Sequence, residues 1–147
     1  MPMAERNASV VWNGGLADGK GTLKLVTSGA AELPVSWPAR VEEAGGNTSP
    51  EELIAAAHAS CYAMAFSNVL GQAGHGPEQL KVEAVCTLDM VDGGPKVTKV
   101  DLTVLGKVPG LDQSGFESLA LQAEQGCPIS NLVRHGAEIS VTATLEG

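Results

Sequence analysis

The chain has 147 residues, of which 44% are hydrophobic and 18% are charged, and its formal net charge at pH 7 is −8. This composition is typical of a globular protein with a packed core and excludes a disordered chain. The acidic balance and an aromatic content of only 3% argue against nucleic acids and anionic membranes as partners. We predict a single domain over residues 1–147.

The first part of the chain predicts a short antiparallel hairpin and then an irregular segment. Residues 8–12, ASVVW, have the composition of a strand, and the following Asn13 and Gly14 tolerate the positive φ of a turn. Residues 21–29 are the expected return strand. Residues 30–46 contain two prolines and end in Gly-Gly, which indicates an irregular or edge segment.

A long helix is predicted to begin after Ser49 and to run to about Leu70. Ser49 suits the N-cap, Pro50 suits the first helical position, and Glu52 completes the pattern of a capping box. Apolar residues occur on every face of this helix, so we expect it to be central and covered by a sheet, a partner chain or both. Its longest uncharged apolar run, residues 53–66, is shorter than a bilayer requires.

The second half of the chain predicts a hairpin, a helix and a strand. Apolar and polar residues alternate over residues 80–107 on both sides of a turn at VDGG. Residues 116–123 have the spacing of an amphipathic helix, and residues 137–145 alternate as a final strand. This order of elements predicts an α+β fold with antiparallel sheet and helices on one side.

Three cysteines occur in a chain whose N-terminus lacks the apolar region of a secretory signal, so we expect a cytoplasmic protein without a disulfide framework. Cys86 lies on the apolar side of a predicted strand and is interpreted as a core residue. Cys127 precedes a proline at the start of a short predicted helix, where the helix dipole favours a thiolate. Cys61 lies within the long helix, where burial disfavours a thiolate unless a cation approaches. The residues alone leave open whether Cys127 is reactive or only marks a junction between helices.

Several segments together resemble the OsmC/Ohr family of thiol-dependent peroxidases. They are GGNTSPEELIAAAHASC and GCPISNL, with PARVEE before the long helix and KVPGLD before the second helix. The resemblance is stronger to the OsmC branch, because a tyrosine is more usual at the position of His58 in the Ohr branch. It implies a peroxidase that reduces organic hydroperoxides, and hydrogen peroxide to a varying degree. It also implies an intertwined α+β homodimer that needs no cofactor.

The resemblance assigns roles to four residues. It makes Cys61 the peroxidatic cysteine, Cys127 the resolving cysteine, Arg40 the active-site arginine and Glu51 the carboxylate partner of that arginine. It implies a sulfenic acid on Cys61, a Cys61–Cys127 disulfide and re-reduction by a dithiol, which for the Ohr-type members is a lipoylated protein. Arg40 would lower the pKa of Cys61 and bind the peroxide oxygens through its forked donors.

Helix geometry adds a constraint on the assembly. Glu51 and Cys61 are ten residues apart on one predicted helix, which corresponds to about 15 Å along its axis. Glu51 therefore cannot touch the thiol of its own chain. We infer from this spacing that Arg40 and Glu51 of one subunit serve the cysteines of the other in a homodimer.

Alternative functions remain compatible with these residues. His58 lies three residues before Cys61 on the same helix face, which would suit a Cys/His metal site. The chain has no short CxxC or HxxxH pair, so an interior histidine with its hydrogen bonds satisfied is the preferred interpretation. A protein of thiol–disulfide exchange or ligand binding, without peroxidase chemistry, would need the cysteine pair but not Arg40. Arg134, seven residues after Cys127, is an alternative cation for either thiol.

Overall fold

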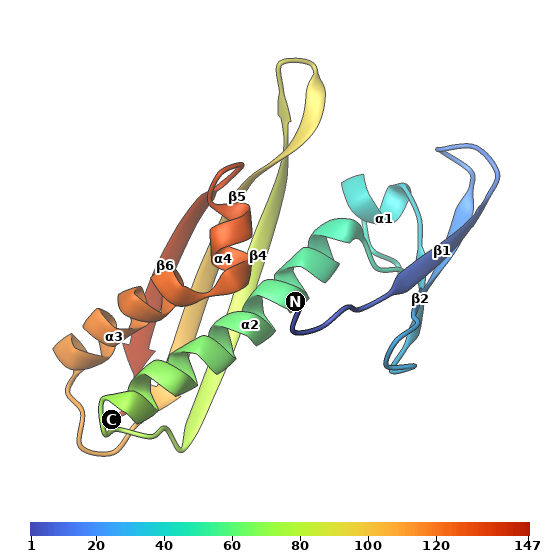
Figure 1. Cartoon of the computed structure of the whole chain (residues 1–147). Coiled ribbons are helices and arrows are strands. Elements are labelled where there is room, and N and C mark those ends of the chain that lie inside the picture. Colours follow the sequence, from blue (N-terminus) through green and yellow to red (C-terminus); the bar gives the residue numbers. More distant parts are fainter. The chain divides into compact units, whose positions relative to one another are not determined.

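A computed structural model describes all 147 residues and shows two compact units, residues 1–53 and residues 54–147. Each unit contains its own three-stranded sheet (Figure 1). The long helix α2, Pro50–Gln72, begins in the first unit and continues into the second. The organisation as a single domain remains a prediction.

The first unit is built on an antiparallel sheet with the order β1-β2-β3. Strand β1 is Ala8–Asn13, β2 is Lys20–Leu25 and β3 is Glu32–Val35. The hairpin predicted from Asn-Gly is present, and Gly14 has the positive φ of 97° that this turn requires. The segment predicted to be irregular contains the edge strand β3 and a short helix α1, Pro38–Val41.

Helix α2 is capped by Ser49, as its sequence pattern predicted. The N–H of Glu52 donates to Ser49 Oγ at 3.1 Å, so Ser49 caps the helix. The Glu52 carboxylate accepts a hydrogen bond from the Thr48 hydroxyl, which differs from a complete capping box. The helix ends at Gln72, slightly later than predicted.

The second unit contains the predicted hairpin and a third strand, in the order β4-β5-β6. Strand β4 is Gln79–Val91, β5 is Gly94–Lys107 and β6 is Glu138–Leu145. Asp92 and Gly93 between β4 and β5 both have positive φ, of 50° and 81°, as the tight turn of a hairpin requires.

Strand β6 runs parallel to β5, whereas the sequence predicted a wholly antiparallel sheet. Between these strands lie the helices α3, Gln113–Gly126, and α4, Pro128–Val133. The helical segment brings the chain back to the end of the sheet where β5 starts, as a crossover between parallel strands must. Alternation along a strand reveals its buried face but not its direction, and for this reason the expectation for β6 was wrong. The α+β fold itself is confirmed.

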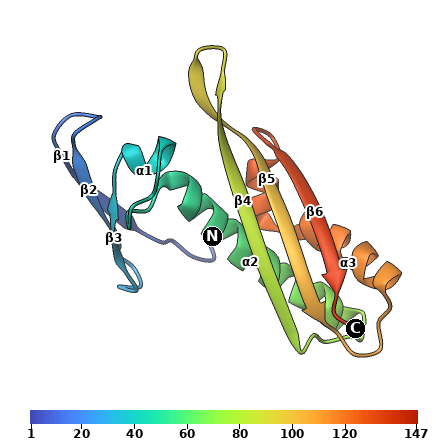
Figure 2. The ribbon, with the colours of Figure 1, turned by 180° about the vertical axis from the view of Figure 1, so that it is seen from behind.

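Helices α2, α3 and α4 cover one face of the second sheet (Figure 2). The fully buried residues of α2 in this unit recur at every fourth position: His58, Tyr62, Phe66 and Leu70. The Phe66 ring packs on Phe116 of α3, with the ring centroids 4.9 Å apart, and on the inward side of β5. Met64, on another side of α2, is 69% exposed. Only one stripe of this apolar helix is therefore covered within the unit.

Helix α2 extends beyond both ends of the uncharged apolar run of residues 53–66. By length and composition alone its 23 residues could cross a bilayer, a property that central helices of globular proteins share. Its buried stripe packs on a sheet in this structure, as the sequence predicted for a central helix.

Gly106 of β5 lies against the Phe116 ring, and a Cβ at this position would be 2.6 Å from a ring carbon. We expect Gly106→Ala to lower the free energy of unfolding by about 1–3 kcal/mol, because an overpacked core must shift its neighbours. Denaturation in urea measures this change. Gly94→Ala on the same strand is the control, since a Cβ there meets no atom within 4 Å. Equal losses in the two variants would show that Phe116 does not restrict Gly106.

Candidate functional site

Two of the predicted site residues, Cys61 and Cys127, are in direct contact. Cys61 lies in the middle of α2, and Cys127 joins α3 to α4. The Cys127 thiol donates to Cys61 Sγ at 3.3 Å, although 66 residues separate them in the chain. Cys127 is fully buried and Cys61 is half-buried. Formation of a disulfide would shorten this distance by roughly 1.3 Å, so no large movement is required.

The junction between α3 and α4 positions Cys127. Asp112 caps the start of α3, and its carboxylate accepts a hydrogen bond from the Gly115 N–H at 2.8 Å. Cys127 then has extended backbone angles, φ −74° and ψ 118°, and Pro128 begins α4. A proline disfavours helical angles in the residue before it, so α3 stops at this point and α4 starts in a new direction.

The electrostatic surroundings of Cys61 are set mainly by burial. Burial raises the pKa of the Cys61 thiol, and a hydrogen bond from the Ile129 backbone N–H to its sulfur partly opposes this. The sequence suggested that the start of α4 would favour a thiolate on Cys127. The structure directs an N–H of this first turn at Cys61, and Cys127 makes no side-chain cap to its own helix. A cation close to the sulfur would oppose this effect of burial on the pKa of Cys61.

Arg134 is engaged elsewhere. Its guanidinium donates to the carboxylate and the carbonyl oxygen of Glu124 and to the side-chain oxygen of Asn131. The Glu124 side chain is only 9% exposed, and a buried carboxylate is costly unless it is paired. Arg134 therefore neutralises Glu124, a partnership that sequence reasoning missed because the two residues are ten positions apart on different helices.

Arg40 and Glu51 form a two-pronged ion pair in the first unit. Arg40 Nε lies 2.9 Å from Glu51 Oε1, and Arg40 Nη2 lies 2.9 Å from Glu51 Oε2. Glu51 stands in the first turn of α2, and α1 presents Arg40 with the Trp37 ring 5.8 Å from its Cζ. These bonds occupy Nε and Nη2 and leave the Nη1 donors for another acceptor. The two residues are partners, and their part in catalysis remains a prediction.

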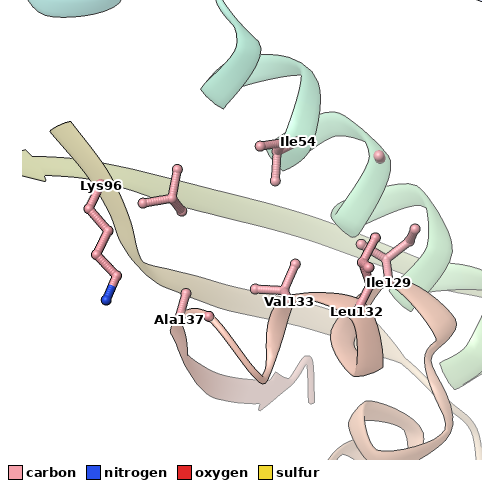
Figure 3. A pocket seen from close by; sticks show the side chains of 9 residues that line it. Ile54, Lys96, Ile129, Leu132, Val133 and Ala137 are labelled. Carbon is pink, nitrogen blue, oxygen red and sulfur yellow. The ribbon is translucent and has the colours of Figure 1, made fainter.

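Each unit has an apolar hollow beside one of these pairs. In the first unit, Arg40 borders a hollow of about 350 Å³ whose walls include Trp12 and Trp37. In the second unit, a hollow of about 430 Å³ lies between α2, β5 and α4 (Figure 3). Its only charged lining residue is Lys96, and one of its walls is Ile129, whose N–H reaches the Cys61 sulfur. Ile129 thus borders this hollow with its side chain and contacts the Cys61 sulfur with its backbone.

A buried polar pair lies one helical turn away from the cysteines. His58 Nε2 is 2.6 Å from Ser130 Oγ, and both residues are fully buried. The sequence predicted an interior histidine with its hydrogen bonds satisfied, but His58 Nδ1 has no partner. Burial lowers the pKa of His58, and the negative charge of Glu124 opposes this only in part. No three His, Cys, Asp or Glu side chains converge as metal ligands would.

Sequence reasoning did not identify Ser130. The spacing of the residues could have identified it. Ser130 lies three residues after Cys127, and His58 lies three residues before Cys61. Residues at this spacing share one side of a helix, so a contact between the cysteines brings the other two residues close together.

The low pKa of His58 makes folding sensitive to acid. Its value lies below the ordinary 6.5, so the unfolded chain binds a proton near pH 6.5 that the folded chain does not yet bind. We expect the contribution of His58 to be fully favourable above pH 6.5 and to be lost as the pH falls through the folded pKa. Urea denaturation from pH 7.5 down to about pH 5, above the range in which most carboxylates titrate, measures this loss.

His58→Gln should show a smaller loss of stability over this range than the unchanged protein. His135→Gln, which alters an exposed histidine, is the matched control. The assignment to His58 is wrong if the two variants alter the pH dependence to the same extent.

The fold and this geometry define a class: an α+β protein with two apposed thiols between its central helix and a short second helix. A family model described as OsmC-like protein matches residues 43–142. Peroxiredoxin OsmC of Escherichia coli K12 is 39% identical over 135 residues, which is 92% of each chain. An organic hydroperoxide resistance protein of Xanthomonas axonopodis pv. citri is 30% identical over 115 residues, 77% of this chain and 79% of that protein.

The fold is also that of solved structures. The crystal structure of an organic hydroperoxide resistance protein OsmC from Legionella pneumophila matches with a TM-score of 0.77 and 24% identity. The match covers 98% of this chain and 99% of that one. The chain belongs to the OsmC-like family, which confirms the resemblance found in its sequence.

Proposed function

We propose that this protein is a cysteine-based peroxidase that reduces organic hydroperoxides. The 3.3 Å contact between the sulfurs of Cys61 and Cys127 carries the proposal, because it places a second thiol where a newly formed sulfenic acid can be captured. Relatives named peroxiredoxin OsmC and organic hydroperoxide resistance protein support the same chemistry.

The reaction has three steps. The Cys61 thiolate attacks the terminal oxygen of the hydroperoxide, the O–O bond breaks, and the alkoxide leaves and takes up a proton as an alcohol. Cys127 then attacks the sulfur of the Cys61 sulfenic acid, and a disulfide and water form. An external dithiol reduces the disulfide through a mixed disulfide and is itself oxidised. We propose a dithiol carrier of the lipoylated type as this reductant, and no cofactor takes part.

The cation that activates Cys61 is proposed to be Arg40 of a second subunit, held by Glu51. Burial raises the pKa of Cys61, so its reactivity depends on a positive charge, and Arg134 is occupied by Glu124. Glu51 is ten residues before Cys61 on the continuous helix α2, about 15 Å along the axis. In a homodimer the partner subunit supplies Arg40 and Glu51, so the distance along α2 no longer keeps them from Cys61.

Exposed apolar surface supports the homodimer. Every residue of β1 is exposed, and Val11 in this strand is 64% exposed. Met64 projects from the side of α2 that the second unit leaves uncovered. Apolar surface of this kind in a folded chain is typical of an interface.

The preference for organic over inorganic peroxides is supported by the apolar hollow that Ile129 and α4 border. Burial of the organic group there would contribute about 25 cal/mol per Å² of apolar surface, a term that hydrogen peroxide lacks.

Substitution of each cysteine tests the order of the steps. We expect Cys61→Ser to abolish the consumption of cumene hydroperoxide. Cys127→Ser should complete only one turnover and accumulate a sulfenic acid, because the attacking thiol remains and the resolving thiol is gone. Stopped-flow assays of the pre-reduced protein, with dimedone trapping and mass spectrometry, measure both results.

Cys86→Ser is the matched control for the loss of a thiol. It should consume peroxide at the normal rate and lose two thiols per chain, since Cys86 lies on β4 in neither helix of the pair. Retention of all thiols by the unchanged protein in excess hydroperoxide would refute the proposed function.

Substitution of Arg40 separates a peroxidase from a protein of thiol–disulfide exchange. Hydrogen bonds to charged groups contribute about 1.5–3 kcal/mol, so Arg40→Ala should slow hydroperoxide consumption about 10- to 100-fold. Alkylation of Cys61 by iodoacetamide should slow as well, because less thiolate is present. Lys24→Ala, which breaks the exposed ion pair Lys24–Glu32, is the control and should change neither rate. Unchanged rates in Arg40→Ala would favour exchange.

Mixed dimers show whether the site is shared between subunits. Arg40→Ala and Cys61→Ser chains, refolded together, should recover about a quarter of the normal activity, because half of the dimers are mixed and each has one complete site. Mixtures that remain inactive, with mixed dimers shown by mass spectrometry, would place Arg40 and Cys61 of one chain in the same site.

A further inference from the structure

We propose that His58 and Ser130 are positioning residues that hold α4 against α2, so that Cys127 captures the Cys61 sulfenic acid before a second peroxide oxidises it. The inference rests on the proposed peroxidase function and concerns two residues outside the four assigned to it. Its subject is the resolution step, which decides whether the enzyme recovers or is inactivated.

Two side-chain links join α2 to α4, and they lie one helical turn apart. The first is the contact of Cys61 with Cys127 at 3.3 Å, and the second is the hydrogen bond of His58 with Ser130 at 2.6 Å. On α2 the two residues are three positions apart, and Ser130 follows Cys127, the N-cap of α4, by the same spacing, so the two links lie side by side. During catalysis the first link is opened by an oxygen atom on Cys61, and the second link then remains.

Helix α4 has one further bond to α2, from the Ile129 N–H to the Cys61 sulfur, and this bond ends on the atom that oxidation changes. The helix is six residues long, and Ser130 is its only fully buried residue. Leu132 is 75% exposed, and Ile129 and Val133 line the apolar hollow (Figure 3). Contacts with α3 and β6 support the other sides of α4. The bond of Ser130 with His58 is therefore the side-chain link between α4 and α2 that does not involve the Cys61 sulfur.

A polar pair at this place costs stability that an apolar pair would not. Both groups are removed from water, and His58 Nδ1 is buried without a partner. Apolar packing tolerates shifts that a hydrogen bond, limited in length and angle, does not. A constraint on distance explains why the chain retains a polar pair, with one unpaired nitrogen, next to its redox cysteines.

Two reactions compete for the Cys61 sulfenic acid. In one reaction the Cys127 thiol attacks the Cys61 sulfur, the S–O bond breaks, and the proton of the thiol leaves with the hydroxide as water. In the other, a second hydroperoxide transfers an oxygen to the sulfur, and a sulfinic acid and an alcohol form. The first reaction depends on the distance from Cys127, and the second depends on the peroxide concentration. A loosened α4 slows only the first reaction.

The test is stopped-flow oxidation of the pre-reduced Ser130→Ala protein by cumene hydroperoxide, with mass spectrometry of Cys61. We expect the peroxide-dependent first phase to change by less than about twofold and disulfide formation to slow about tenfold, the effect of one buried hydrogen bond. The peroxide concentration at which half of Cys61 becomes sulfinic acid should fall by the same factor. Ser130→Thr, which keeps the hydroxyl group, should restore the normal partition.

Tyr62→Phe is the matched control. It removes another buried hydrogen bond of α2, from the Tyr62 hydroxyl to the Ala120 carbonyl oxygen at 2.8 Å, but this bond leads to α3. It should lower stability without raising the yield of sulfinic acid. An equal rise in sulfinic acid in Tyr62→Phe and Ser130→Ala, or an equal slowing of both phases in Ser130→Ala, would overturn the proposal.

Oxidation by diamide tests the positioning role of His58 and Ser130 independently of the proposed peroxidase function. Diamide accepts two electrons from two thiols and joins them as a disulfide, so it needs no peroxidase activity. Slower closure of the Cys61–Cys127 disulfide in Ser130→Ala supports the positioning role even if the unchanged protein ignores hydroperoxides. Closure at the normal rate in Ser130→Ala overturns the positioning role, whatever the result with peroxide.

Discussion

The burial of one stripe of α2 controls the arrangement of the second unit. Tyr62, Phe66 and Leu70 face the sheet, and this fixes the rotation of the helix about its axis. Cys61, next to Tyr62, is consequently turned to the margin of the buried stripe, where α4 and the thiol of Cys127 meet it. The position of the Cys61 sulfur is thus set by the packing of neighbouring apolar residues.

Burial in this unit also disfavours the thiolate form of Cys61. The sulfurs stand among buried groups whose charges are already compensated, with Glu124 held by Arg134 and His58 kept neutral by burial. Within this unit burial raises the pKa of Cys61, and the hydrogen bond from the Ile129 N–H opposes this only in part. The forked donors of Arg40, held by Glu51, belong to the other compact unit.

The sequence predicted those structural elements that depend only on residues close together in the chain. The Ser49 cap, the Asp-Gly turn at residue 92 and the alternation in β4 and β5 each depend on neighbouring residues, and the structure has all three. The direction of β6 depends on where a crossover ends, and no periodicity records that. Helix α1 has only four residues between irregular segments, too few for a pattern.

The candidate site also contains residues that the sequence identified and contacts that only the folded chain shows. Resemblance to a family identified Cys61, Cys127, Arg40 and Glu51, whereas spacing alone left their roles open. The bond of His58 with Ser130 joins residues 72 positions apart, so only the folded chain shows it. The hydrogen bond from Ile129 to Cys61 uses a backbone group, which has no signature in the sequence at all.

The continuity of α2 limits how the gene for this protein can change in length. One residue inserted between Ser49 and Cys61 would turn the cysteine by about 100° and move it about 1.5 Å relative to the start of the helix. The sulfur would then face away from α4, or the cap and Glu51 would lose their places. Insertions at the exposed turn between β4 and β5 carry no such cost. Related chains should therefore differ in length at that hairpin and keep a constant spacing from the cap to the first cysteine.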